Sequence, residues 1–356
     1  EIMQKYSFDL KQSNIAKGFF VMVMVFHHVF HVHMNYNLTF VTGREVPDLL
    51  TKIALYGKVC VGGFCFLSAY GITKKLMAEK TTAKNIVISR LVKLYLAYWP
   101  IYLFGIIGTL LFGNKSLSSI YINVKTQAFS WILPVLDVLG LADFFKTPML
   151  NAHWWYMSVA LYVIILTPAI YYLCKKFKYL PAFAILALAY IIDIYSFCYI
   201  AIAGLGVICA KEDLLVKLKT KICSNVVTRI VGYLAILLLN VAGYELYLIS
   251  SELPAMPLSL AACLLLCYVI LADIPGLSHV LAFLGKHSAN IYYVHGFLYL
   301  YWFTYTIYSL ANKPLIYVVV LAGSLALSII LELIKKLVRY NKLEQTIIQK
   351  LSGNKQ

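Results

Sequence analysis

Charged residues are scarce in this chain. Only 13% of its 356 residues are charged, and Asp and Glu together number 15. A soluble globular domain has about 25% charged and about 45–50% apolar residues, whereas 62% of this chain is hydrophobic. The apolar excess is too large for one core, and it falls in runs near the ~20 residues that cross a bilayer. We therefore expect the whole chain to lie in a membrane, which excludes a separate soluble domain.

Cysteine pairs with zinc-binding spacing are also missing. None of the eight cysteines forms a CxxC pair. Several of them, such as Cys65 and Cys263, lie inside apolar runs, where they act as small hydrophobic residues. The first apolar run begins near Ala16 and has no small-residue cleavage site, so we expect a retained helix and not a signal peptide.

The net charge of +16 could suggest a nucleic-acid partner. The basic residues, however, stand in short clusters between apolar runs, as at 74–84 and 175–178. Such clusters are the topology signal of a membrane protein, because Lys and Arg stay on the cytoplasmic side. The partner that this charge indicates is the bilayer, and we expect no nucleic acid.

The apolar runs predict an all-α polytopic membrane protein with a bundle of about ten transmembrane helices. The predicted spans are 15–34, 54–73, 94–112, 153–173, a two-helix hairpin within 180–210, 230–249, 257–272, 289–309 and 315–334. The segment 113–152 is interrupted by prolines, so we expect a long outer loop with interfacial or re-entrant structure. Residues 335–356 are expected to form a cytosolic tail, and 1–356 a single integral membrane domain.

The orientation of the chain in the membrane is predicted from the distribution of its Lys and Arg residues. With both termini cytosolic, seven of the 31 Lys and Arg residues lie outside and 24 lie inside. This asymmetry favours cytosolic termini over the inverse topology. We expect a multi-pass protein of the plasma membrane, and the abundance of Lys and Tyr with little Arg favours a bacterial cytoplasmic membrane.

The first span is the richest in polar residues. Lys17 begins it, and His27, His28 and His31 lie near its far end. Eleven helical steps from Lys17 to His28 give a net rotation of about 20° and a rise of about 16 Å, so both share one face. His31 lies within about 60° of that face, and His27 points further round. Polar residues inside a span usually face the bundle interior.

Three interpretations of these histidines are open. Each can make a satisfied hydrogen bond between helices. His27 and His31 have the i, i+4 spacing of metal ligands, but no carboxylate or Cys in the span completes a site, so we expect no metal. The interpretation that we favour is a neutral imidazole, kept uncharged by desolvation, that acts as a general base toward a hydroxyl.

A second polar stripe lies in the ninth predicted span. Ser288, Tyr292, His295 and Tyr299 are four, three and four residues apart and share one helical face. With His31, the first three of these are candidates for lining a cavity, although packing between helices through hydroxyl groups is an equal alternative. The pair Trp154–Trp155 is expected in the interfacial aromatic belt.

A group of cations is expected at the cytosolic mouth. Arg90 and Lys93 are three residues apart and lie on one side of a helix. Spacing alone favours simple anchoring at the membrane surface. Together with Lys17 and Lys286, they would surround a mouth that suits a phosphorylated ligand.

Five segments in order resemble the acyltransferase family 3 membrane proteins. They are NIAKGFFVMVMVFHHVF, with a basic residue followed eleven positions later by His, then GGFCFLSAYGI, ISRLVKLYLAYW, HWWYMSVALYVIILTP and LGKHSANIYYVH. The resemblance implies transfer of an acyl group, commonly acetyl from acetyl-CoA, to a hydroxyl of a cell-surface polysaccharide or lipid-linked sugar. It implies no permanently bound cofactor, because acyl-CoA is the donor substrate.

The resemblance also implies roles for residues. His28 would be catalytic, and Lys17, Arg90 and Lys93 would serve the CoA phosphates or the acyl donor. The chain departs from the family pattern at Lys17 and Lys93, where Arg is usual, and at Ala160, where many members have Glu. Some relatives carry a fused extracytoplasmic hydrolase-like domain; this chain is expected to act alone or with a separate partner.

Two other functions stay open at this point. A transporter or exporter of a glycan or small polar solute would use membrane histidines and a polar stripe equally well. A ligand-sensing membrane module is a third interpretation, and no signalling domain supports it. A homo-oligomer is compatible with all three.

Overall fold

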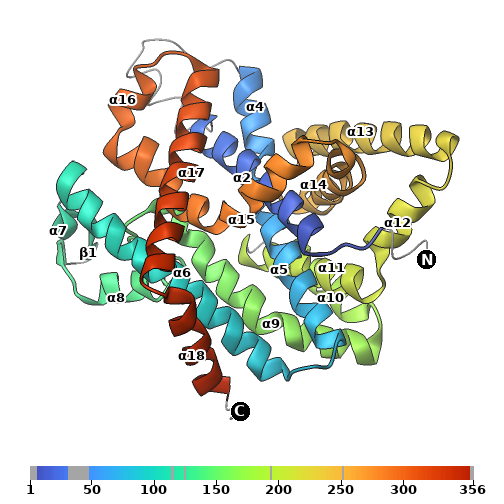
Figure 1. Ribbon diagram of the computed structural model, residues 1–356, viewed down its shortest axis with the longest axis horizontal. Coiled ribbons are helices and arrows are strands. Elements are labelled where there is room, and N and C mark those ends of the chain that lie inside the picture. Colours follow the sequence, from blue (N-terminus) through green and yellow to red (C-terminus); the bar gives the residue numbers. More distant parts are fainter. Residues whose placement is uncertain are drawn as a thin grey trace. The chain divides into compact units, whose positions relative to one another are not determined.

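The computed structural model describes residues 6–30, 48–113, 116–123, 126–192, 195–250 and 252–352 (Figure 1). The only strands in these ranges are β1 (Ile122–Asn123) and β2 (Ala128–Phe129), which pair antiparallel with Ile122 opposite Phe129. The rest of the regular structure is helical. Of the predicted cavity residues, His31 lies outside the described residues.

The helices follow one another along the whole chain. They are α2 (Leu10–Phe30), α4 (Asp48–Tyr56), α5 (Val59–Met77), α6 (Ala83–Phe112), α7 (Leu117–Ile120), α8 (Ile132–Val138), the 3-10 turn η1 (Ala152–Trp155), α9 (Tyr156–Phe177), α10 (Leu180–Ile192), α11 (Tyr195–Lys211), α12 (Leu214–Ile222), α13 (Val226–Ile249), α14 (Glu252–Leu265), the π-helical turn η2 (Leu266–Ile270), the 3-10 turn η3 (Leu271–Asp273), α15 (Leu277–Gly296), the π-helical turn η4 (Phe297–Trp302), α16 (Thr304–Tyr308), α17 (Lys313–Leu337) and α18 (Tyr340–Ser352).

Seven stretches of described helix are long and apolar enough to cross a membrane. They are Leu10–Phe30, Leu49–Met77, Ala83–Phe112, Ala152–Phe177, Val226–Ile249, Ala255–Asp273 and Lys313–Leu337. The predicted hairpin within 180–210 consists of two shorter apolar helices, α10 and α11. The architecture is that of an all-α polytopic membrane protein. A total of about ten spans and cytosolic termini stay predictions.

The predicted span at 289–309 has a different form. Its helix, α15, begins earlier, at Leu277, and ends at Gly296. The π-helical turn η4 follows and shifts the angular position of each residue after Gly296. The turn ends at Phe303, whose backbone (φ −125°, ψ 29°) leaves the helical region, and the short helix α16 then begins. The sequence pattern did not indicate this break.

The chain divides into two compact units. The first contains Glu1–His27, Asp48–Thr81 and Val163–Ser288. Its helices approach one another closely at glycines. A Cβ on Gly18 would lie 1.9 Å from the Leu281 carbonyl oxygen, and one on Gly285 would lie 1.8 Å from that of Asn14. Only glycine therefore allows the first half of α2 to pack against the first half of α15.

The second unit contains His28–Pro47, Thr82–Tyr162 and Ala289–Gln356. Its core is mostly aromatic and consists of Tyr98, Ile101, Tyr102, Tyr121, Leu133, Leu150, Trp154, Met157, Tyr293, Val294 and Phe297. Helix α18 packs along α6 (Figure 1), where the Tyr340 hydroxyl donates to the Leu96 carbonyl at 2.8 Å. Residues from α6, α8, η1, α9 and α15 thus share one core, which fixes the position of the 3-10 turn η1.

Candidate functional site

The 3-10 turn η1 carries His153 and is held from several sides. The Asn151 side chain accepts a hydrogen bond from the His153 backbone N–H at 3.0 Å, so it caps the turn. The Tyr292 hydroxyl donates to the His153 carbonyl at 2.8 Å, and the Tyr301 hydroxyl accepts from the Ala152 N–H at 2.8 Å. These bonds attach the turn to α15 and η4.

Gly296 permits the close approach of η1 to the end of α15. A Cβ at that position would lie 2.6 Å from the His153 ring and 2.7 Å from the Asn151 side-chain oxygen. Since real Cβ atoms do not come so near, any side chain at 296 would displace the His153 ring. The glycine at the end of α15 is therefore part of what positions the imidazole.

Three histidines from distant parts of the sequence meet in the second unit. His28 Nδ1 lies 2.8 Å from His295 Nε2. The ring centroids are 4.0 Å apart for His28 and His153, 4.9 Å for His28 and His295, and 4.8 Å for His153 and His295. His295 is fully buried, whereas His28 and His153 are half-buried. We call these three residues the histidine cluster.

The ring orientations suit hydrogen bonding and stacking better than metal binding. One nitrogen of each ring lies within 4.8 Å of the others, a spacing that a metal ion could bridge. Metal ligands, however, direct their lone pairs at one central point. Here the ring planes are nearly parallel, at 17°, 21° and 27°, and His28 directs a nitrogen at His295 itself. The arrangement is that of a hydrogen-bonded pair, His28 and His295, with the His153 ring stacked beside both.

A buried carboxyl supports the segment before η1. Asp137 in α8 is 1% exposed and accepts hydrogen bonds from the Tyr121 hydroxyl at 2.6 Å and the Leu150 N–H at 2.7 Å. Burial raises the pKa of Asp137 to about 6, and these hydrogen bonds oppose the rise. Asp137 thus fixes the chain just before Asn151. It was not among the predicted site residues.

The predicted donor-binding cations occupy both units. In the second unit, the Nε of Arg90 is buried and has no hydrogen-bond partner among the described residues. Lys93, one turn later on α6, is half-exposed, and its Nζ lies 3.6 Å from Glu344 of α18. In the first unit, Lys17 lies on α2 and is half-buried, and Lys286 lies exposed on α15.

The polar stripe of α15 has mixed environments. His295 belongs to the histidine cluster, and the Tyr292 hydroxyl donates to the His153 carbonyl. Tyr299, which lies in η4, has its hydroxyl 2.5 Å from His153 Nε2. The Ser288 hydroxyl instead donates to the Gly285 carbonyl of its own helix at 2.9 Å. His27, beside His28, points its Nδ1 at the Ala54 carbonyl at 2.6 Å.

Two features near η1 differ from the sequence analysis. His153 was not singled out, although it lies in the segment HWW; an aromatic-flanked histidine after the prolines of the 113–152 segment was the available signal. The interfacial assignment of Trp154 was wrong. Trp154 is 2% exposed, and its indole N–H donates to the Tyr293 carbonyl at 3.1 Å, because the aromatic core of the unit encloses it.

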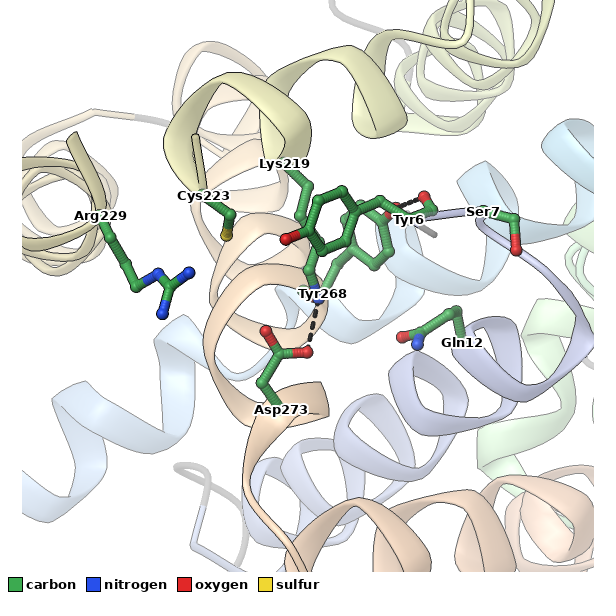
Figure 2. A pocket seen from close by; sticks show the side chains of 8 residues that line it. All are labelled: Tyr6, Ser7, Gln12, Lys219, Cys223, Arg229, Tyr268 and Asp273. Atoms are coloured by element: carbon green, nitrogen blue, oxygen red, sulfur yellow. Dashed lines mark hydrogen bonds and ion pairs between the residues drawn. The ribbon is translucent and has the colours of Figure 1, made fainter. Parts of the chain in front are cut away.

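A pocket of about 340 Å³ lies in the first unit, and none of its lining residues is a predicted site residue (Figure 2). It is lined by Tyr6, Ser7, Gln12, Lys219, Cys223, Arg229, Tyr268 and Asp273. Figure 2 shows Lys219 beside the rings of Tyr6 and Tyr268. Its ammonium donates at 2.7 Å to both the Tyr268 carbonyl and Asp273. The buried Lys219 thus links α12 to the turns η2 and η3, which follow α14.

One comparison with known proteins identifies the family of the chain. The sequence pattern of acyltransferase family 3, described as an acyltransferase domain, matches residues 10–333. No curated protein matches the chain. No solved structure matches it either. The family pattern covers nearly the whole chain, including all three members of the histidine cluster, and so the chain belongs to acyltransferase family 3 and is an acyltransferase of the membrane type.

Proposed function

We propose that this protein transfers an acyl group, acetyl being the expected one, from acyl-CoA to a hydroxyl of a cell-surface polysaccharide or lipid-linked sugar. The single observation that carries the proposal is the histidine cluster. Two half-buried imidazoles, on His28 and His153, lie against the fully buried His295. A membrane acyltransferase needs a base that removes a proton from the acceptor, and neutral imidazole suits that task near neutral pH.

The proposed reaction uses His28 as the general base. Its imidazole takes the hydroxyl proton while the acceptor oxygen attacks the thioester carbonyl carbon. The new C–O bond forms and the C–S bond breaks, and the leaving thiolate takes the proton back from the imidazolium. The products are an ester and free CoA thiol, and His28 returns to its neutral form. No permanently bound cofactor is required, and no metal takes part in any of these steps.

The donor is proposed to bind through cations. Acyl-CoA carries several negatively charged phosphate oxygens, which charge-assisted hydrogen bonds recognise. Arg90 supports this assignment, since a buried guanidinium nitrogen without a described partner is costly unless a ligand accepts its hydrogen bond. Lys93 lies on the same side of α6, and Lys17 and Lys286 keep the donor-binding role that the sequence predicts for them.

The test is acyl transfer by purified protein reconstituted in liposomes. With radiolabelled acetyl-CoA and a glycan extract as acceptor, we expect label on the glycan and an equal release of CoA thiol. The alternative, a transporter of a glycan or polar solute, would move its solute across the liposome membrane without binding or cleaving acetyl-CoA. Solute uptake with neither label transfer nor thiol release would therefore overturn the proposal.

A further inference from the structure

The backbone around His295 determines where its proton lies. His295 Nδ1 is 2.7 Å from the Tyr292 carbonyl and 3.1 Å from the Ile291 carbonyl. Carbonyl oxygens only accept, so Nδ1 must carry a proton. His295 is 0% exposed and has no carboxylate partner among the described residues, so a charged ring would be buried without compensation. In the neutral ring, the lone pair is then on Nε2.

That lone pair determines the tautomer of His28. His28 Nδ1 lies 2.8 Å from His295 Nε2. Two lone pairs cannot form a hydrogen bond, so His28 Nδ1 must be the donor. The hydrogen bond that one ring nitrogen makes sets the protonation of the other. Neutral His28 therefore carries its lone pair on Nε2.

The third ring contacts a tyrosine. The Tyr299 hydroxyl lies 2.5 Å from His153 Nε2, and a hydroxyl can donate to that nitrogen or accept from it. Either neutral tautomer of His153 therefore satisfies this contact. Its ring is stacked 4.0 Å from that of His28, with 27° between the planes. A positive charge that forms on His28 thus meets the lone pair of His295 at one edge and the ring of His153 at one face.

We propose that His295 is a positioning residue that holds His28 in the Nδ1–H tautomer, so that Nε2 is the atom that accepts the proton. This inference rests on the proposed function for the identity of the reaction. When Nε2 of His28 takes the hydroxyl proton, the Nδ1–H bond to His295 is retained, and no ring has to turn. The burial of His295 agrees with this division, because only the half-buried His28 and His153 can meet a substrate.

The experiment reads the tautomer directly. Protein labelled with ¹⁵N-histidine in lipid nanodiscs gives separate ¹⁵N shifts for protonated and unprotonated ring nitrogens, and the His28→Asn variant identifies the His28 signals. We expect Nδ1 protonated and Nε2 unprotonated in the neutral protein. His295→Leu should abolish this preference. His295→Gln, whose side-chain oxygen can accept in place of Nε2, should restore it.

Activity supplies the second readout. With acetyl-CoA as donor, His295→Leu should lower kcat about 10- to 100-fold, the usual effect of losing the group that orients a functional imidazole, with KM for acetyl-CoA little changed. His295→Gln should recover most of kcat, and a variant that was merely misfolded would not be rescued in this way. Thermal unfolding of each variant in nanodiscs provides the folding control.

Three results would overturn the assignment. They are an Nε2–H tautomer of His28 in the native protein, an unchanged kcat in His295→Leu, and tight stoichiometric binding of Zn²⁺ that His28→Asn abolishes. If the tautomer changes as expected but no variant, native protein included, transfers acetyl, the proposed function fails while the role of His295 in positioning the ring stands.

Discussion

Two adjacent histidines on α2 have different partners. His27 is 7% exposed and donates from Nδ1 to the Ala54 carbonyl, whereas His28 is half-buried and donates to His295. Successive residues of a helix point about 100° apart, so neighbours in sequence need not share an environment. His27 is accounted for by a backbone contact, and only His28 joins the cluster. At the scale of single residues, the chemistry thus depends on which face of α2 each imidazole occupies.

The donor-binding role of Arg90 has a direct test. Arg90→Gln should raise KM for acetyl-CoA about 10- to 100-fold, because a hydrogen bond to a charged group contributes about 1.5–3 kcal/mol. The matched control is Lys84→Gln, which removes one positive charge from an exposed position of the same helix. Steady-state kinetics of CoA release measure both. Equal KM values in the two variants would remove Arg90 from the donor site.

Much of the histidine cluster was predictable, but its assembly was not. Helical spacing indicated His28 and His295 as polar residues within spans. Their hydrogen bond joins positions 267 residues apart, which spacing within one helix cannot reveal. His153 was missed because a 3-10 turn, capped by Asn151 and admitted by Gly296, positions it, and no helical periodicity marks such a turn.

At the scale of elements, apolar runs located the long helices well. They did not indicate the π-helical turn η4, because the run of bulky apolar residues continues through the break at Phe303. The segment 113–152 was expected to be interrupted, and its described residues form the short elements α7, β1, β2 and α8 and the start of η1. Asp137, one of two acids in this segment, gave no periodic signal, yet it links Tyr121 to Leu150 through hydrogen bonds.

Asp137 should make the stability of the protein depend on pH. Burial raises its pKa from 3.8 to about 6, so between these values the folded state binds more protons than the unfolded state. The free energy of unfolding should therefore fall as the pH rises from about 4 to 6 and should be level above that range, as far as this group is concerned. Thermal unfolding of solubilised protein across this range measures the effect.

The control for this pH dependence is a second acid of the same segment. Asp137→Asn should remove the fall in Tm between about pH 4 and 6, since the amide does not titrate. Asp143→Asn changes an acid whose side chain pairs with Lys146 at the surface, and the fall should persist. A fall of the same size in Asp137→Asn would assign the titration to another group.

At the scale of the whole molecule, the amino-acid composition predicted that the chain lies in a membrane. The apolar excess appears as exposed apolar helix faces: Val226 and Val227 at the start of α13 are each 70% exposed, and Leu333 of α17 is 55% exposed. Exposing apolar area of this kind to water is unfavourable, whereas contact with lipid tails avoids that cost. The charge asymmetry predicts cytosolic termini, and the family pattern matches residues 10–333, from the start of α2 into α17.

The most direct test of the account compares two neighbouring histidines in the acetyl-transfer assay. His28→Asn and His27→Asn make the same chemical change one residue apart, and Asn at position 27 can still donate to the Ala54 carbonyl. Loss of a general base lowers the rate about 10²- to 10⁴-fold. We expect a loss of this size in His28→Asn and near-normal transfer in His27→Asn, with both proteins folded. Normal acetyl transfer by folded His28→Asn would contradict the account.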